Sequence, residues 1–270
     1  MNLRMVLFCM LSGLVFLLPG AGAGNAGWWY LSGVLIAASL LPVVMYGPKT
    51  MAGQFSVISV AIIVVGLVCI LSEGMLFYPE QRAQMAKSMG TGIVMYLAAT
   101  AVMVILARML KLGRESAVEV EPRAATTVAP MVLLSAIAYV GYYMVFGAIT
   151  FQLFTKKYYP HAAEQFAALG NWFWVYQLGR GLLMVLAVLP IIYTLRLTRR
   201  KAALLVGILV WVVGGLAPLV VPNTTMVTAQ RYEHIVEIFT QNFSLGVTAV
   251  CLLRRKTAAA VTAPMRSALV

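Results

Sequence analysis

The sequence predicts an all-α fold, a polytopic transmembrane helix bundle, and three observations lead to that fold class. The chain has 270 residues, of which 62% are hydrophobic and 10% are charged, whereas an ordinary soluble domain has roughly 25% charged residues. Its mean hydropathy is +0.91. Its apolar residues fall in runs of about 20, the length a helix needs to cross the hydrocarbon core. These features exclude a soluble globular domain, a disordered chain and a disulfide scaffold.

Eight apolar runs are long enough to be membrane spans, numbered here as spans 1 to 8. They lie at 5–20, 28–46, 55–73, 90–110, 128–150, 171–195, 202–221 and 234–253. The chain then divides into a membrane half with spans 1 to 4 (1–110), a polar linker (111–127), a membrane half with spans 5 to 8 (128–256) and a disordered tail (257–270). Short loops and tails leave no room for a soluble domain.

The first run also has the features of a secretory signal. Arg4 precedes an apolar segment at 5–18, and Ala21 and Ala23 fit a signal-peptidase site. Cleavage of residues 1–23 would leave seven spans with the N-terminus outside. We expect the run to be retained as a helix, because a multi-span protein rarely needs a cleavable signal.

The basic residues predict how the spans are oriented. If both termini lie in the cytoplasm, 14 of the 20 Lys and Arg residues fall in cytoplasmic segments and 5 in outer segments, as the positive-inside rule requires. We therefore predict a plasma (bacterial inner) membrane protein with cytoplasmic termini. Although the net charge is +12, the bases form short clusters between apolar runs rather than a basic stripe, which argues against nucleic acid as a partner. The expected partners are membrane lipids, and a homo-oligomer or a membrane partner subunit stays open.

The outer connections suggest an internal repeat. Tyr78-Pro79 after span 3 and Tyr159-Pro160 after span 5 are each followed by alanines and a glycine. The bundle is therefore possibly built of four repeated hairpins of one orientation, as parallel repeats occur in transporters. The alternative is chance similarity between apolar segments.

Polar residues inside spans 6 and 8 form the candidate site, because ionisable groups within a membrane are expensive and usually functional. Span 6 carries Gln177 and Arg180. In span 8, His234, Glu237 and Gln241 have the spacing of one helical face. Both spans descend from the outer surface, so we predict an Arg180–Glu237 ion pair with Gln177 and Gln241 nearby.

Two interpretations of this predicted pair stay open. A buried pair can simply lock two helices together. It can also belong to an outward cavity between spans 6 and 8 that holds a polar or anionic solute, with Arg180 binding the anion and Glu237 or His234 exchanging protons. The second interpretation describes a small permease-like transporter. Glu73, at the end of span 3, is expected to be solvated.

Other chemistries have weaker support in the sequence. Glu233, His234 and Glu237, with His161, contain metal-ligand types, but the duplicated Glu-x-x-His pattern and HExxH are absent. A haem held by the two histidines is a further possibility. We predict no cofactor and assign no catalytic residue, since GxSxG and the P-loop are also missing. The alternatives are a membrane-embedded enzyme acting on a lipid or quinone, with Glu237 and His234 as acid and base, and a non-catalytic assembly subunit.

Overall fold

The computed structural model describes residues 2–21, 24–116, 118–121 and 123–255. In these residues it contains helices and no strand. Eight helical segments are long and apolar enough to cross a membrane. The predicted all-α helix bundle is thereby confirmed, and the chain is an integral, multi-pass membrane protein. The predicted tail at 257–270 lies outside the described residues.

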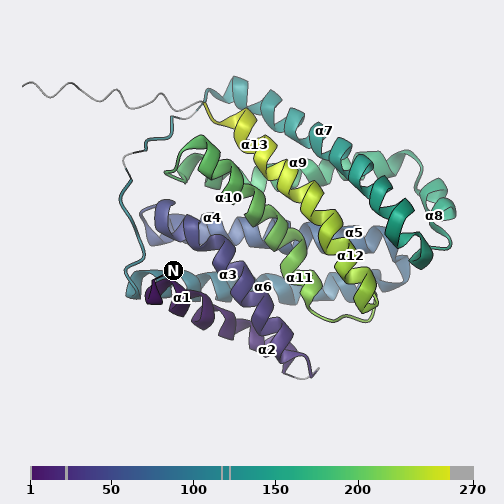
Figure 1. Ribbon diagram of the computed structural model, residues 1–270, viewed down its shortest axis with the longest axis horizontal. Helices are drawn as coiled ribbons and strands as arrows, with labels where there is room; N and C mark the ends of the chain where they lie inside the picture. The colour runs from purple at the N-terminus through teal and green to yellow at the C-terminus, as the bar shows by residue number, and fades with distance from the viewer. Residues whose placement is uncertain (1, 22–23, 117, 122, 256–270) are drawn as a thin grey trace, which may run out of the picture.

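The first four spans run back and forth along the bundle (Figure 1). Their elements are α1 (Leu3–Gly13), η1 (Leu14–Phe16) and α2 (Leu17–Gly20) in span 1; α3 (Ala26–Tyr46) in span 2; α4 (Met51–Ile63), η2 (Val64–Val68) and α5 (Cys69–Phe77) in span 3; and η3 (Pro79–Gln81) and α6 (Arg82–Met109) in span 4.

Spans 5 to 8 follow in the same manner, with a short helix between spans 5 and 6. Their elements are α7 (Ala125–Thr150), η4 (Phe151–Thr155) and η5 (Lys156–Tyr158) in span 5; α8 (Ala162–Leu169) in the loop; α9 (Asn171–Thr194) in span 6; α10 (Arg199–Trp211), η6 (Val212–Leu216) and α11 (Ala217–Val220) in span 7; and α12 (Thr228–Ile238), η7 (Phe239–Phe243) and α13 (Ser244–Leu253) in span 8.

Span 3 is longer than the sequence suggested. The apolar run ends at position 73, but α5 continues to Phe77 and stops where Tyr78 leaves the helical region at φ −127° and ψ 71°. Tyr78 precedes Pro79, and the ring of a proline disfavours the helical conformation of the residue before it. The extra turn places Glu73 within the helix instead of at its end.

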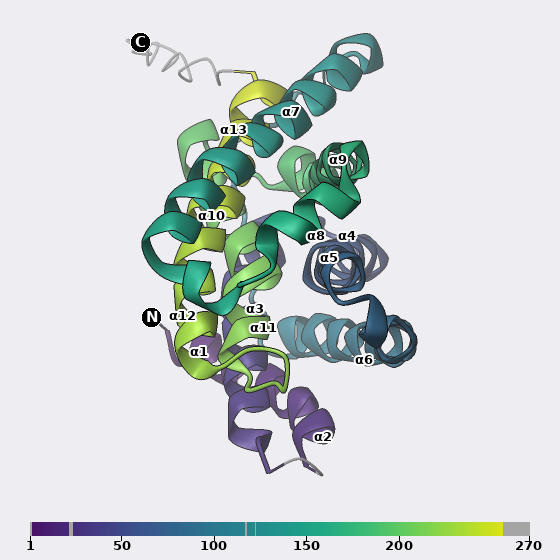
Figure 2. The same cartoon turned by 90° about the vertical axis from the view of Figure 1, so that its right-hand side faces the viewer.

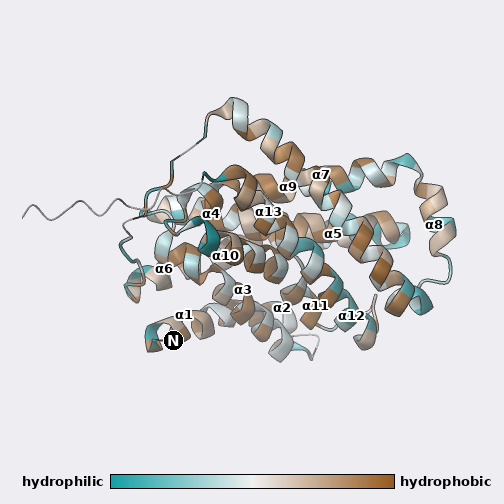
Figure 3. Ribbon diagram, turned by 45° about the horizontal axis from the view of Figure 1, so that its top comes forward, coloured by the Kyte–Doolittle hydropathy of each residue, from teal (hydrophilic) through white to brown (hydrophobic). Residues whose placement is uncertain are grey.

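One end of the bundle is basic, and its arginines bind the carbonyl groups that helix ends leave free. We call this end, which holds Leu3 and Leu253, the basic end. Arg196 Nε donates to the Tyr46 carbonyl at 3.3 Å, and Arg123 Nε donates to the Leu253 carbonyl at 2.9 Å. Hydrophilic residues are also prominent around α8 and α12 towards the opposite end (Figure 3).

The two halves of the chain have the same arrangement of spans. In Figure 2, where α5, α6 and α9 are seen nearly end-on, α6 lies on the opposite side of the molecule from α13, and α1 and α2 lie on the opposite side from α7. The packing agrees: α1 packs on α3 as α7 packs on α9, and α4 packs on α6 as α10 packs on α13. Spans 1 to 4 therefore correspond to spans 5 to 8.

The sequence carries the same correspondence. A shift of 148 residues takes Pro42 in α3 to Pro190 in α9. The same shift takes the Val-Val-Gly at 64–66 to the Val-Val-Gly at 212–214, and the Leu-x-x-Thr-Ala-Val at 97–102 to that at 245–250. Each Val-Val-Gly begins a π-helical segment that follows 13 residues of α-helix.

Spans 3 and 7 meet in a reciprocal contact. A Cβ atom on Gly66 would lie 2.9 Å from Cγ1 of Val213, and one on Gly214 would lie 2.9 Å from Cγ1 of Val65. Reciprocity of this kind is the mark of a twofold axis. Since spans 3 and 7 run in the same direction, the axis is parallel to the spans.

Spans 1 and 2 cross as spans 5 and 6 do. Gly33 lies so close to the Phe16 ring that a Cβ atom would not fit, and a Cβ atom on Gly181 would lie 2.9 Å from the Tyr139 ring. The repeated unit is therefore four spans long, twice the hairpin that the outer connections suggested. The Tyr-Pro pairs at 78–79 and 159–160 do not correspond to each other in this repeat.

Candidate functional site

Arg180 forms a buried ion pair, but its partner is not the one predicted. Its side chain, on α9, is 4% exposed, and Nη1 lies 2.7 Å from Oε1 of Glu73 on α5. Gln177 Nε2 donates to the same oxygen at 3.5 Å. The predicted Arg180–Glu237 pair is therefore wrong. Glu73, which was expected to be solvated, is instead the ion-pair partner of Arg180, and its side chain is 22% exposed.

The helix packing explains this partner. Span 6 packs against span 3, whose α4, η2 and α5 all contact α9, whereas α7 packs closely on both α9 and α13. The sequence offered one signal for Glu73, an acidic residue at the end of an apolar run. Glu73 could be recognised as a residue within the span only if the helix was known to end at Phe77, four residues further on.

Aromatic and hydroxyl groups surround the ion pair. The Arg180 guanidinium carbon lies 5.8 Å from the centre of the Tyr139 ring, within the range of a cation–π contact. The Tyr176 hydroxyl is 2.8 Å from Oγ of Ser72 on the helix that carries Glu73. Gly181 allows the close approach of α7, since a Cβ there would lie 2.9 Å from Tyr139.

Three polar atoms in this cluster have no hydrogen-bond partner among the described residues. They are the Tyr139 hydroxyl, Oε1 of Gln177 and Nε of Arg180. Tyr139 and Gln177 are fully buried. An unpaired polar atom in such a place costs about 1–3 kcal/mol, so native proteins normally give it a partner or a function. The cluster offers one donor, one acceptor and one hydroxyl that can act as either.

The cluster lies where the two halves of the molecule meet. Glu73 belongs to span 3 in the first half, and Arg180, Gln177 and Tyr139 belong to the second half. The equivalent contact, between spans 2 and 7, is apolar or small: the shift of 148 residues takes Ser32 to Arg180 and Glu73 to Val221. The polar pair is therefore present at one of two corresponding interfaces.

Three other predicted residues form a separate hydrogen-bonded chain on span 8, together with a tyrosine that the sequence analysis did not select. His234 Nδ1 lies 2.8 Å from Oε2 of Glu237, and Gln241 Nε2 donates to Oε1 of Glu237 at 3.0 Å. The Tyr159 hydroxyl lies 2.8 Å from Nε2 of His234. The spacing on one helical face revealed the three span 8 residues, whereas Tyr159 comes from the loop before α8 and no local pattern points to it.

The residues that the sequence offered as weak metal-ligand candidates do not all come together. Glu233 forms an ion pair with Lys157 at 3.1 Å, and His161 lies 3.4 Å from the exposed Glu164. In the part of the chain that the structure describes, no group of three or more His, Cys, Asp or Glu side chains is placed to bind a metal.

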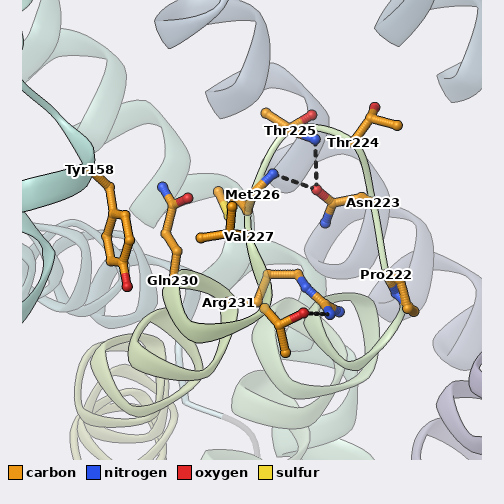
Figure 4. Close-up of a pocket in the computed structure, with 10 residues that line it drawn as sticks. Tyr158, Pro222, Asn223, Thr224, Thr225, Met226, Val227, Gln230 and Arg231 are labelled. Carbon is orange, nitrogen blue, oxygen red and sulfur yellow. Dashed lines mark hydrogen bonds between the residues drawn. The ribbon is translucent and has the colours of Figure 1, made fainter.

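Two cavities among the described residues lie away from Arg180 and Glu237. One, of about 540 Å³, lies around the loop before α12 and is lined by residues that include Tyr158, Asn223, Gln230 and Arg231 (Figure 4). The other, of about 490 Å³, lies beside Arg123 and α7 at the basic end. The predicted open cavity between spans 6 and 8 is neither of these.

Comparison with protein-family models, with curated proteins and with solved structures finds no match. A function for this chain is therefore argued from its own residues. The observations that bear on it are the buried ion pair between the halves, the unpaired polar atoms around that pair, and the separate chain on span 8.

Proposed function

We propose that this protein is a small permease-like transporter of a polar solute, with its binding site at the Glu73–Arg180 pair. The observation that carries the proposal is the set of unpaired buried atoms around the pair, on Tyr139, Gln177 and Arg180. Charged and polar groups inside a membrane are costly, and where they occur they commonly mark substrate pathways. A solute that supplied the missing hydrogen bonds would repay that cost.

The position of the site supports transport over a purely structural role. Several transporter folds consist of parallel repeats related by an axis along the membrane normal, and their solutes bind near the midplane between the repeats. Here the halves correspond span by span, and the polar cluster lies between span 3 of the first half and spans 5 and 6 of the second. A structural lock would not require polar atoms without partners.

The charges of the site indicate the class of solute. Glu73 and Arg180 neutralise each other at 2.7 Å, so a bare anion would have to compete with the carboxylate for the guanidinium. A zwitterion or an uncharged polar molecule avoids this competition, because it can accept from Arg180 Nε and donate to Gln177 Oε1. The proposal therefore narrows the predicted polar or anionic solute to a small molecule without net charge.

The basic end supports an orientation with both termini in the cytoplasm. Arginines are concentrated there, as the positive-inside rule predicts for cytoplasmic segments. The Arg196 backbone N–H donates to the Tyr46 carbonyl at 2.9 Å, and the Arg196 side chain binds the same carbonyl, so this residue ties the second half to the first. The described conformation is then one in which the halves are held together on the cytoplasmic side.

A thermal-shift screen of the purified protein tests the proposal. The probes are small zwitterions and neutral polar compounds, each at millimolar concentration. A compound that binds the folded state stabilises it by about 2.7 kcal/mol at 100 times its Kd, so at least one should raise the Tm of the native protein. The same compound should not raise the Tm of the Glu73→Leu/Arg180→Leu double variant.

The matched control is the Glu121→Leu/Arg255→Leu double variant, which removes one charge of each sign from an exposed pair. It should respond to the compound as the native protein does. If no compound separates the two double variants, the ion pair is structural and the proposed site fails.

A further inference from the structure

The hydrogen-bonded chain on span 8 has the geometry of a proton relay. Tyr159 Oη, the two ring nitrogens of His234 and Glu237 Oε2 follow one another with successive contacts of 2.8 Å. The arrangement that satisfies all of them has the tyrosine donating to Nε2 and Nδ1–H donating to the carboxylate. Each member can then give up one proton while it accepts another.

One end of the hydrogen-bonded chain, at Tyr159, is close to the outer surface. Gln230 lines the cavity of about 540 Å³, and its side chain contacts Tyr159. Burial raises the pKa of Tyr159, and the neighbouring Tyr78 raises it further, although the contact with Gln230 opposes this. Tyr159 therefore stays protonated at neutral pH and passes a proton by exchange rather than by becoming a stable phenolate.

The other end of the hydrogen-bonded chain, at Glu237, lies deeper in the membrane. Glu237 is nine residues into α12, about 13 Å below its start at 1.5 Å per residue. Gln241 Nε2 donates to Oε1 of Glu237. Gly147 of α7 lies close to the same oxygen, since a Cβ there would lie 3.3 Å from it.

The other side chains near the hydrogen-bonded chain do not take the place of Tyr159, His234 or Glu237. From the segment after η4, Lys157 faces α12 but pairs with Glu233. From α7, Tyr143 lies near Glu237 and also near Glu73 and Arg180. The elements α11 and η6, which also pack against α12, contribute apolar residues and glycine. His234 is thus the group that connects Tyr159 with Glu237.

We propose that Tyr159 and His234 form a proton-uptake path that begins beside Gln230 at the outer surface, and that Glu237 is the proton-binding site at its inner end. One O–H bond of a hydronium ion beside Gln230 breaks as its proton binds Tyr159 Oη. The tyrosine proton moves to Nε2 of His234, and the Nδ1 proton moves to Glu237. Water is released, the carboxylate becomes a carboxylic acid, and the imidazole ends with its proton on Nε2.

The position of α7 suggests what this proton does. Tyr139, Tyr143 and Gly147 follow one another at intervals of four residues on one face of α7. Tyr139 contacts Arg180 and Gly147 lies beside Glu237, so about 12 Å of a single helix connects the Arg180 cluster with Glu237. A change in the charge of Glu237 acts on the same helix that packs against Arg180. This use of the proton rests on the proposed transport function, whereas proton uptake itself can be measured without any solute.

Time-resolved infrared spectroscopy of sealed, uniformly oriented proteoliposomes tests the relay, with an acid jump applied outside as the probe. We expect a carboxylic-acid C=O band to appear in the native protein and to be absent from Glu237→Gln. Tyr159→Phe should slow its appearance by about 100-fold, the lower range for loss of a positioned proton-transfer group. The matched control is Tyr232→Phe, which removes an exposed hydroxyl from α12, the helix that carries His234 and Glu237, and should leave the rate unchanged.

Three results would overturn the relay: no band assigned to Glu237, equal rates in the two phenylalanine variants, or equal rates when acid is added inside. The Glu73→Leu/Arg180→Leu variant separates this proposal from the transport function. If that variant keeps the band while no solute binds the native protein, the relay stands and the proposed solute site fails. If a solute binds the native protein and no band appears, the relay fails.

Discussion

Removing either member of the Glu73–Arg180 pair should destabilise the protein, and the two losses should differ. Glu73→Leu leaves the Arg180 guanidinium 4% exposed and without its carboxylate. Arginine cannot lose its charge in a protein, so we expect a loss of about 3–5 kcal/mol, as for other broken buried pairs. Arg180→Leu leaves a carboxylate that is 22% exposed and can take up a proton, so about 1–3 kcal/mol is expected.

Replacing both residues should restore most of the stability, because apolar replacement of a whole buried pair is often neutral or stabilising. The assay is reversible unfolding in mixed micelles, with all four proteins compared at one pH. The double-mutant cycle then gives the coupling energy of the pair. Additive losses, or a larger loss for Arg180→Leu than for Glu73→Leu, would refute the reasoning.

Three further predictions concern the repeat, the ion pair between Lys157 and Glu233, and the tyrosine of the relay. Gly66→Ala should cost about 1–3 kcal/mol through overpacking, and Val213→Ala, but not Val65→Ala, should restore the Tm, because the contact is with Val213. Lys157→Gln should change stability by less than about 1 kcal/mol, because the lysine end of its ion pair with Glu233 is 60% exposed, and unfolding in mixed micelles checks this. Since burial raises the pKa of Tyr159, its contribution to stability is complete below pH about 10 and falls at higher pH. Tyr159→Phe should therefore reduce the loss of Tm above pH about 10.

The sequence was sufficient for features that depend on neighbours along the chain. Span number follows from apolar runs, because every backbone polar group in a membrane must be paired within a helix or a barrel. The grouping of His234, Glu237 and Gln241 also follows, because residues three and four apart share a helical face. Gln177 and Arg180 come together in the structure for the same reason.

Features that depend on contacts between helices did not follow. Depth in the membrane was the reason to pair Arg180 with Glu237, but depth does not determine which spans are adjacent, and α7 packs on both of the helices involved. Glu73 was misjudged because the end of the apolar run was taken as the end of the helix, four residues before Phe77. Tyr159 lies 75 residues from His234 in the chain, beyond any helical spacing.

The repeat is visible in the sequence as a unit of four spans, and a comparison of two-span hairpins does not detect it. Matching Tyr78-Pro79 with Tyr159-Pro160 compares connections that are not equivalent in the structure. The motifs separated by 148 residues are short and lie in three different spans. The reciprocal contact between Gly66 and Val213 and between Gly214 and Val65 shows that they belong to one relation.

Exchange of a solute across proteoliposomes most directly tests the central claim, that the Glu73–Arg180 cluster is the binding site of a transporter. The solute is the compound that stabilises the native protein, supplied unlabelled inside and labelled outside. The account predicts exchange by the native protein and by Glu121→Leu/Arg255→Leu, and none by a folded Glu73→Leu/Arg180→Leu variant. Equal exchange by both double variants would contradict the account.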